Sequence, residues 1–176
     1  MRAFLFVCLA GLTIGLSGCG QVTATDEVAP ASGGNNSLSA ILGDSLVNAA
    51  GETIATEDLH AEKIGLYFSA IWCPPCRAFT PLLVDAYNEL QAAGEAFEVV
   101  FVSADRSADA MQQYLADYNM PWSAIPFDAN ARSALPQQHR IRGIPSLVII
   151  DAEGNVLNSN AVMDIRDHGA DAFARW

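Results

Sequence analysis

Two cysteines near the middle of the chain are the side chains best suited to carry chemistry. Cys73 and Cys76 stand in the run Trp72-Cys73-Pro74-Pro75-Cys76, where an apolar stretch meets a stretch with helical spacing. Two thiols three positions apart at a helix start can lie close enough to form a disulfide. Free N–H groups and the positive end of the helix dipole favour a thiolate on the first sulfur. The spacing therefore predicts a redox dithiol in which Cys73 attacks and the more enclosed Cys76 resolves the mixed disulfide.

The residues around this pair leave few alternatives to redox chemistry. Pro74 and Pro75 suit a helix start, because the first helical turn has no N–H partner to lose. A zinc site or an inert buried cysteine pair is the alternative. Structural zinc needs four ligands, whereas the chain beyond its first eighteen residues adds only Cys19 and three histidines without paired ligand spacing, His60, His139 and His168. We therefore expect no metal and no cofactor.

Strands and helices alternate around the dithiol, and these elements must position it. Apolar runs predict strands at residues 46–47, 63–69, 97–103, 146–150 and 156–157. Helical spacing predicts helices at residues 74–93, 105–118, 129–138 and 164–175. Gly94 suits the C-terminal cap of the dithiol helix, and Pro81 should kink that helix. The order predicts an α/β fold with right-handed crossovers and a mixed central sheet flanked by helices on both faces.

Length and charge limit the class of protein. The chain has 176 residues, of which 51% are hydrophobic and 16% charged, and its mean hydropathy is +0.21. This composition suits one globular domain plus a tail and excludes a disordered acidic chain. The net charge is −11, with 9 Lys and Arg against 20 Asp and Glu. That balance argues against nucleic-acid binding through clustered cations and against a polybasic membrane anchor.

The first nineteen residues have the pattern of a bacterial lipoprotein signal. Arg2 precedes an apolar run over residues 3–16, which is too short to span a membrane as a helix and suits a secretory signal. The run ends in Leu16-Ser17-Gly18-Cys19, which resembles a lipobox, where cleavage precedes a cysteine that carries lipid. The alternative is an ordinary signal peptide cut nearby, with Cys19 as a bystander.

The signal pattern divides the chain into three parts. Residues 1–18 would be removed, residues 19–37 would be the lipidated Cys19 and a flexible linker of small and polar residues, and residues 38–176 would form the domain. Two or three acyl chains hold a protein stably on a membrane. We therefore expect export and lipid anchoring to a bacterial membrane. In a Gram-negative host, Gly20 after the cysteine favours the outer membrane, facing the periplasm.

Three segments resemble the thioredoxin superfamily and, within it, the tryparedoxin and nucleoredoxin branch. Residues 65–81 read GLYFSAIWCPPCRAFTP and residues 120–127 read MPWSAIPF, and both match that branch. Residues 142–146 read RGIPS and match the superfamily's loop with a cis-proline facing the dithiol. The resemblance covers residues 40–176 and implies a thioredoxin-like fold.

The resemblance also implies a role for each residue of the site. Cys73 would be the attacking thiol and Cys76 the resolving thiol, linked as a redox-active disulfide. Trp72 would shield the edge of the site. Pro145 would be the cis-proline, and the backbone of Ile144 beside it would pair with an extended substrate segment. Pro74 and Pro75 would support the first turn between the two thiols.

One position departs from the pattern of many thioredoxins. Those proteins place a buried Asp six residues before the nucleophile as a proton acceptor for the resolving thiol, whereas this chain has Tyr67. Tyr is a poor base near neutral pH. Glu62, Asp105 and Asp128 are the other carboxylate candidates, and each is expected on the surface. Trp122 is expected either beside the dithiol or in the core.

These observations favour a membrane-anchored, extracytoplasmic thiol–disulfide oxidoreductase that reduces or exchanges the disulfides of protein clients. An unidentified membrane donor would supply electrons, and an oxidase direction stays open because exported proteins meet an oxidising compartment. A reductase serving cytochrome c maturation is one alternative, although residues 120–127 fit the nucleoredoxin-like branch better. A noncatalytic binding module of the same fold is another, and the intact cysteine pair argues against it.

Overall fold

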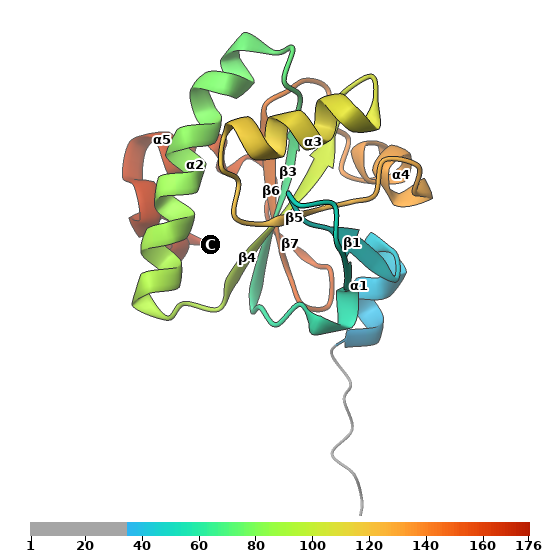
Figure 1. Cartoon of the computed structure of the whole chain (residues 1–176). Coiled ribbons are helices and arrows are strands. Elements are labelled where there is room, and N and C mark those ends of the chain that lie inside the picture. The colour runs from blue at the N-terminus through green and yellow to red at the C-terminus, as the bar shows by residue number, and fades with distance from the viewer. Residues whose placement is uncertain (1–34) are drawn as a thin grey trace, which may run out of the picture. The chain divides into compact units, whose positions relative to one another are not determined.

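The computed structural model describes residues 35–176, all of which belong to one compact unit (Figure 1). The predicted signal peptide, residues 1–18, and the predicted lipid-bearing Cys19 lie outside the described residues. The predicted linker extends to residue 37, but helix α1 (Asn35–Leu42) begins inside it. Helix α1 therefore takes in the last three residues that the sequence analysis assigns to the linker.

A seven-stranded mixed sheet forms the centre of the domain. Its strands run in the order β2-β1-β5-β4-β3-β6-β7. β3 pairs in parallel with β4, and β4 with β5, whereas the remaining pairs are antiparallel. The bounds are β1 (Ser45–Val47), β2 (Thr53–Ala55), β3 (Lys63–Ser69), β4 (Phe97–Ser103), β5 (Ser123–Ala124), β6 (Ser146–Asp151) and β7 (Val156–Asn158). The mixed sheet confirms the predicted fold class.

Helices cover both faces of this sheet (Figure 1). Alternation along the strands separates two cores: Tyr67 and Phe101 face one side, and Leu66 and Val100 face the other. The first core is closed by α2 (Pro74–Ala93), α3 (Ala108–Asp117), α5 (Ala161–His168) and the 3₁₀ helix η2 (Gly169–Arg175). The second is closed by α1 and α4 (Asn130–Gln138). A short 3₁₀ turn, η1 (Thr56–Asp58), follows β2.

Several element bounds differ from the sequence-based prediction for local reasons. α3 begins three residues later than predicted, because Ser107 caps it by accepting a hydrogen bond from the Ala110 backbone at 3.2 Å. β5 was not predicted, since two residues carry no periodic signal. The last helix, predicted at residues 164–175, is instead an α-helix from Ala161 followed by a 3₁₀ helix from Gly169.

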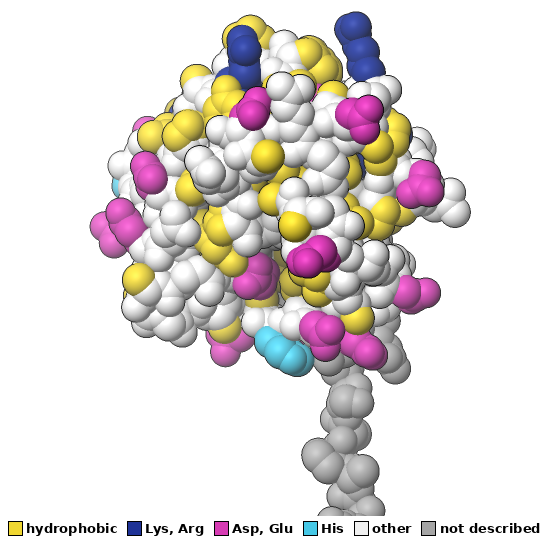
Figure 2. All heavy atoms as spheres, in the orientation of Figure 1, with side chains coloured by type: hydrophobic (Ala, Val, Ile, Leu, Met, Phe, Trp, Pro, Cys, Tyr) yellow, Lys and Arg dark blue, Asp and Glu magenta, His cyan; other side chains and the backbone are white. Residues whose placement is uncertain are grey.

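The surface shown in Figure 2 carries acidic side chains scattered over most of the face in view. The most prominent basic side chains in this view stand at its upper edge, the end at which α2 begins in Figure 1. Within residues 35–176, no helix is long and apolar enough to cross a membrane.

Candidate active site

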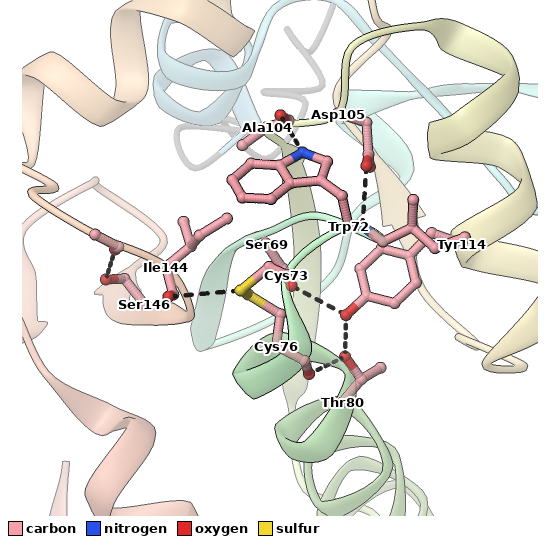
Figure 3. Close-up of a disulfide and its surroundings, with 12 residues drawn as sticks. Ser69, Trp72, Cys73, Cys76, Thr80, Ala104, Asp105, Tyr114, Ile144 and Ser146 are labelled. Atoms are coloured by element: carbon pink, nitrogen blue, oxygen red, sulfur yellow. Dashed lines mark hydrogen bonds between the residues drawn. A yellow bond between two sulfur atoms is a disulfide. The ribbon is translucent and has the colours of Figure 1, made fainter.

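The predicted dithiol lies at the N-terminus of α2 (Figure 3). Cys73 occupies the N-cap position with extended backbone angles, and Pro74 and Pro75 form the first helical positions. Cys73 and Cys76 are joined as a disulfide, with their Cα atoms 5.2 Å apart. Cys76 is fully buried, while Cys73 retains 4% exposure. The geometry leaves the first sulfur as the one nearer to solvent.

A second loop closes over the outer sulfur. The peptide bond from Ile144 to Pro145 is cis, and the Ile144 carbonyl oxygen lies 3.7 Å from Cys73 Sγ (Figure 3). The Ser146 hydroxyl donates to the Gly143 carbonyl at 2.7 Å and so closes the turn that carries this proline. The structure therefore brings Ile144 and Pro145 to the dithiol, as the resemblance implies.

Trp72 covers the outer edge of the site. Its side chain is 52% exposed, and its indole N–H donates to the Ala104 carbonyl at 3.3 Å. This bond ties the residue before Cys73 to the loop that follows β4 (Figure 3). An exposed aromatic ring beside a reactive sulfur offers a surface against which a client segment can pack.

Asp105 is buried, which corrects the prediction that it lies on the surface. It is 4% exposed, and its Oδ1 accepts a hydrogen bond at 2.9 Å from the backbone N–H of Ile71. Its Oδ2 accepts from the Ser103 hydroxyl at 2.8 Å. Burial raises the pKa of this carboxyl, although the two hydrogen bonds oppose the shift. Asp105 thus holds the backbone immediately before the dithiol, whereas Glu62 and Asp128 are exposed as predicted.

Four buried hydroxyl groups, from Ser69, Tyr67, Thr80 and Tyr114, form a hydroxyl cluster behind Cys76. The Thr80 hydroxyl is its centre, 2.6 Å from the Tyr114 hydroxyl and 2.8 Å from the Tyr67 hydroxyl. Thr80 donates to the Cys76 carbonyl at 2.9 Å. The Ser69 hydroxyl lies 3.1 Å from that of Tyr114 (Figure 3). These residues replace the buried carboxylate of many thioredoxins with neutral groups.

The bonds of the hydroxyl cluster fix the direction of its protons. Each hydroxyl has one proton to donate. Because Thr80 gives its proton to the Cys76 carbonyl, it accepts protons from Tyr67 and Tyr114. The Tyr67 hydroxyl also reaches the Cys76 carbonyl, at the longer distance of 3.5 Å. Tyr114 then has none left for Ser69, so Ser69 donates to Tyr114. All four protons are committed, and the bonds converge on the backbone of the resolving cysteine.

The hydroxyl cluster therefore positions Cys76 without serving as its base. Burial raises the pKa of Tyr67 far above its usual range, so this phenol stays neutral. Pro81 lacks an N–H for the carbonyl of Arg77, which removes one backbone bond from the first turns of α2. The Thr80 bond to the Cys76 carbonyl supports the helix beside that gap.

Trp122 is a core residue, the second of its two expected placements. It is 2% exposed, and its ring meets those of Tyr67 and Tyr87 edge-on, with centroids 6.3 and 5.5 Å away. It lies behind Tyr67 in the larger core and supports the wall of the hydroxyl cluster.

The histidines do not gather into a metal site. Among residues 35–176, no group of three or more His, Cys, Asp or Glu side chains could hold a metal ion. His139 packs near Phe68, with ring centroids 6.4 Å apart, and burial lowers its pKa. His60 lies in the loop before β3, and His168 ends α5.

Sequence reasoning missed the parts played by Ser69, Thr80, Tyr114 and Asp105. Ser69 and Thr80 were recognisable only as polar residues on otherwise apolar stripes, and Tyr114 as part of a buried helix face. Burial of Asp105 depends on the Ile71 N–H, 34 positions away. Asp105 is a short polar residue just beyond the carboxyl end of the buried strand β4. This position is the one signal in the sequence that could have indicated a role for Asp105.

A family model described as thioredoxin-like matches residues 61–156. Probable nucleoredoxin 1 of Arabidopsis thaliana is 46% identical over 137 residues, which are 77% of this chain and 23% of that protein. Bovine (Bos taurus) nucleoredoxin is 39% identical over 126 residues, 71% of this chain and 28% of that protein. The chain thus spans about a quarter of the length of the curated relatives it matches.

Solved tryparedoxins share both fold and length with the domain. Tryparedoxin from Trypanosoma brucei superposes with a TM-score of 0.71 at 31% identity, covering 80% of this chain and 97% of that one. Tryparedoxin I from Crithidia fasciculata superposes with a TM-score of 0.69 at 33% identity, covering 76% of this chain and 93% of that one. Tryparedoxin II from C. fasciculata has been solved in complex with glutathionylspermidine, with a TM-score of 0.64 at 36% identity, covering 71% and 86%.

Proposed function

The chain belongs to the thioredoxin-like family of thiol–disulfide oxidoreductases, and from that premise we propose that it reduces or exchanges disulfides of protein clients through Cys73 and Cys76. One observation carries the proposal: the two cysteines form a disulfide at the positive end of α2, with the outer sulfur facing the Ile144 carbonyl. A disulfide at such a helix end gains stabilisation of the thiolate when it is reduced.

The reaction begins on the outer sulfur. The Cys73 thiolate attacks one sulfur of the client disulfide, forming a mixed disulfide and releasing the other client sulfur as a thiolate. The released thiolate takes the proton of Cys76, and the Cys76 thiolate then attacks Cys73 Sγ. This second exchange forms the Cys73–Cys76 disulfide and releases the second client sulfur as a thiolate, which takes a proton from water and leaves the client as a dithiol. Two electrons pass to the client, and an external dithiol must return them for another turnover.

The surroundings of each sulfur support this division of roles. Cys73 keeps contact with solvent and borders the exposed ring of Trp72, so a client can reach it. Cys76 is fully enclosed and its backbone is held by the hydroxyl cluster. A client sulfur attached to Cys73 leaves Cys76 as the thiol positioned next to the new bond.

A reduction assay tests the activity. With dithiothreitol as electron source, the wild-type protein should precipitate insulin well before dithiothreitol alone. Cys73→Ser should match the uncatalysed reaction, because the attacking sulfur is gone. Equal rates for the wild type and Cys73→Ser would remove the proposal. Arg175→Gln, which changes an exposed residue of η2, should keep the wild-type rate. It controls for activity that is lost during purification of a variant.

We further propose that the protein is exported and held on a bacterial membrane by lipid on Cys19, facing the periplasm from the outer membrane in a Gram-negative host. Arg2, the apolar run at 3–16 and the Leu16–Cys19 lipobox support this placement. A membrane-bound dithiol donor would then return the electrons. Globomycin, which blocks lipoprotein signal peptidase, should make the precursor accumulate, and Cys19→Ser should abolish lipid labelling. Unchanged processing under the drug would contradict the anchor.

A further inference from the structure

The charge at the dithiol end of the sheet differs from that of the rest of the domain. Three segments surround the outer sulfur: residues 70–80, 103–109 and 141–146. They hold three of the eight Lys and Arg found in residues 35–176, but two of the eighteen Asp and Glu. One of those two acids, Asp105, is buried and hydrogen-bonded, which leaves Asp109 as the exposed one. The site end therefore carries exposed positive charge on an acidic protein.

Three arginines, Arg77, Arg106 and Arg142, supply this charge, one from each of the three segments. The Arg106 guanidinium lies 6.0 Å from the centroid of the exposed Trp72 ring. The Arg77 backbone N–H donates to the Cys73 carbonyl at 3.1 Å, one helical turn along α2. Arg142 lies two residues before Ile144, and the Ile144 carbonyl oxygen is 3.7 Å from Cys73 Sγ. All three side chains are exposed.

The guanidiniums of Arg77 and Arg142 are uncommitted, unlike the side-chain cations of Lys63 and Arg132. Lys63 donates to the Phe173 carbonyl at 2.9 Å, and Arg132 donates to the Ser103 carbonyl at 3.2 Å. By contrast, the structure shows no hydrogen bond or ion pair for the guanidiniums of Arg77 and Arg142 within the described part of the chain. A free guanidinium binds a carboxylate through two parallel hydrogen bonds.

We propose that Arg77, Arg106 and Arg142 form a cationic rim that selects protein clients with acidic residues flanking the reactive disulfide. The inference rests on the proposed function, because the rim acts on the substrate of the same dithiol. Opposite charge raises the encounter rate of a client segment and orients it on the site. The overall negative charge of the domain repels the same client elsewhere, so productive approach is favoured at this end of the sheet.

Two synthetic peptides test the rim. Each carries one cysteine as a neutral 2-thiopyridyl disulfide, flanked on both sides by Asp in one peptide and by Lys in the other. Attack of Cys73 of the pre-reduced protein on the peptide sulfur releases 2-thiopyridone, which is followed by absorbance. Division by the rate with dithiothreitol removes the intrinsic reactivity of each peptide. We expect the Asp peptide to react about tenfold faster at ~0.01 M ionic strength, and the ratio to approach one at ~1 M.

Charge-removing variants locate the effect. Arg77→Gln combined with Arg142→Gln should lower the preference to about twofold or threefold at low salt. Arg175→Gln removes the same kind of charge from η2, which contacts α2 and borders a pocket with residues 89, 90 and 93 near the C-terminal end of that helix. This variant should keep the tenfold preference. Equal corrected rates for both peptides at low salt would overturn the rim. A matching loss in Arg175→Gln would also overturn it, because the effect would then come from net charge.

The assay separates failure of the rim from failure of the proposed function. If the wild type releases 2-thiopyridone no faster than Cys73→Ser, the dithiol activity itself is contradicted, and the rim with it. If release is fast but indifferent to peptide charge, the activity stands and only the rim is overturned.

Discussion

The two sulfurs of one disulfide lie in opposite surroundings, although only two residues separate the cysteines in the sequence. Around Cys73 the contacts are made by loops: the Ile144 carbonyl, the Trp72 indole and the chain held by Asp105. Around Cys76 they are made by regular elements, since Ser69 ends β3, Thr80 lies in α2 and Tyr114 in α3. Loops tolerate substitution, whereas packed strands and helices constrain it.

The contrast shows how one short motif can serve both recognition of the client and resolution of the mixed disulfide. The outer side presents exposed and charged groups that a client can contact. The inner side presents neutral, fully buried hydroxyls whose bonds admit one arrangement. Changes on the inner side should therefore act on stability and resolution, and changes on the outer side on encounter with the client.

The largest expected effect is the separation of the two cysteines in a trapping experiment. Cys76→Ser should form a mixed disulfide with a client that persists, because no second thiol resolves it. Cys73→Ser should form none. Mass spectrometry of non-reduced complexes from cells that express each variant measures the outcome. A stable client complex in Cys73→Ser would reverse the roles assigned to the two sides.

Removal of the central hydroxyl should be the next largest effect. Thr80→Val keeps the shape of the side chain but removes the nearest acceptor of the Tyr67 and Tyr114 phenols, which leaves Tyr67 only its longer 3.5 Å bond to the Cys76 carbonyl. The expected cost is about 2 kcal/mol in unfolding free energy. Thr80→Ser keeps the hydroxyl and should cost about 1 kcal/mol or less. Urea unfolding measures both. Equal losses in the two variants would show that the cluster contributes through packing alone.

The pH dependence of stability should reveal Asp105. Its pKa is raised in the folded state above the ordinary value of about 3.9, so the folded protein binds the proton more tightly than the unfolded chain. The resulting stability is fully present below about pH 4 and is lost as pH rises through the folded-state pKa. Asp105→Asn removes this dependence.

The difference in unfolding free energy between wild type and Asp105→Asn should therefore fall as pH rises from about 4, and then level off. Denaturant titrations at a series of pH values measure it. Asp128→Asn, a change of an exposed carboxylate on the loop before α4, reports any effect of net charge alone. A difference that grows with pH would mean that the hydrogen bonds of Asp105 outweigh its burial.

The smallest effect is expected from Trp72→Phe. The ring is half exposed and its single hydrogen bond faces solvent, so the unfolding free energy should change by about 0.5 kcal/mol or less. Urea unfolding at neutral pH is the measurement. A loss near that of Thr80→Val would remove the distinction between an adaptable outer side and a fixed inner side.

The buried parts of the fold were the most predictable from sequence. β3 and β4 have the predicted bounds because both strands are buried on two faces and read as continuous apolar runs. α2 also has its predicted bounds, between Pro74 and Gly94, whose positive φ of 78° ends the helix. These limits are set by the residues themselves, without help from distant contacts.

Features that depend on partners far along the chain were not predictable. α1 contains Leu38 and Leu42, which are buried against the sheet, but Asn35 and Asn36 before them resemble loop residues. Asp105 can be buried because the Ser103 hydroxyl and the distant Ile71 N–H both donate to its carboxyl. The cysteine pair itself was recognisable because its spacing is local, whereas its support comes from side chains 34 to 45 positions apart.

The hydroxyl cluster also makes this site observable in a way that most redox sites are not. Hydroxyl protons in contact with water exchange too quickly to give separate nuclear magnetic resonance signals. Those of Tyr67, Thr80 and Tyr114 are shielded and each is held by a bond. They can exchange only when α2 and α3 separate from the sheet. Their lifetimes would thus report how often the wall behind the resolving cysteine opens.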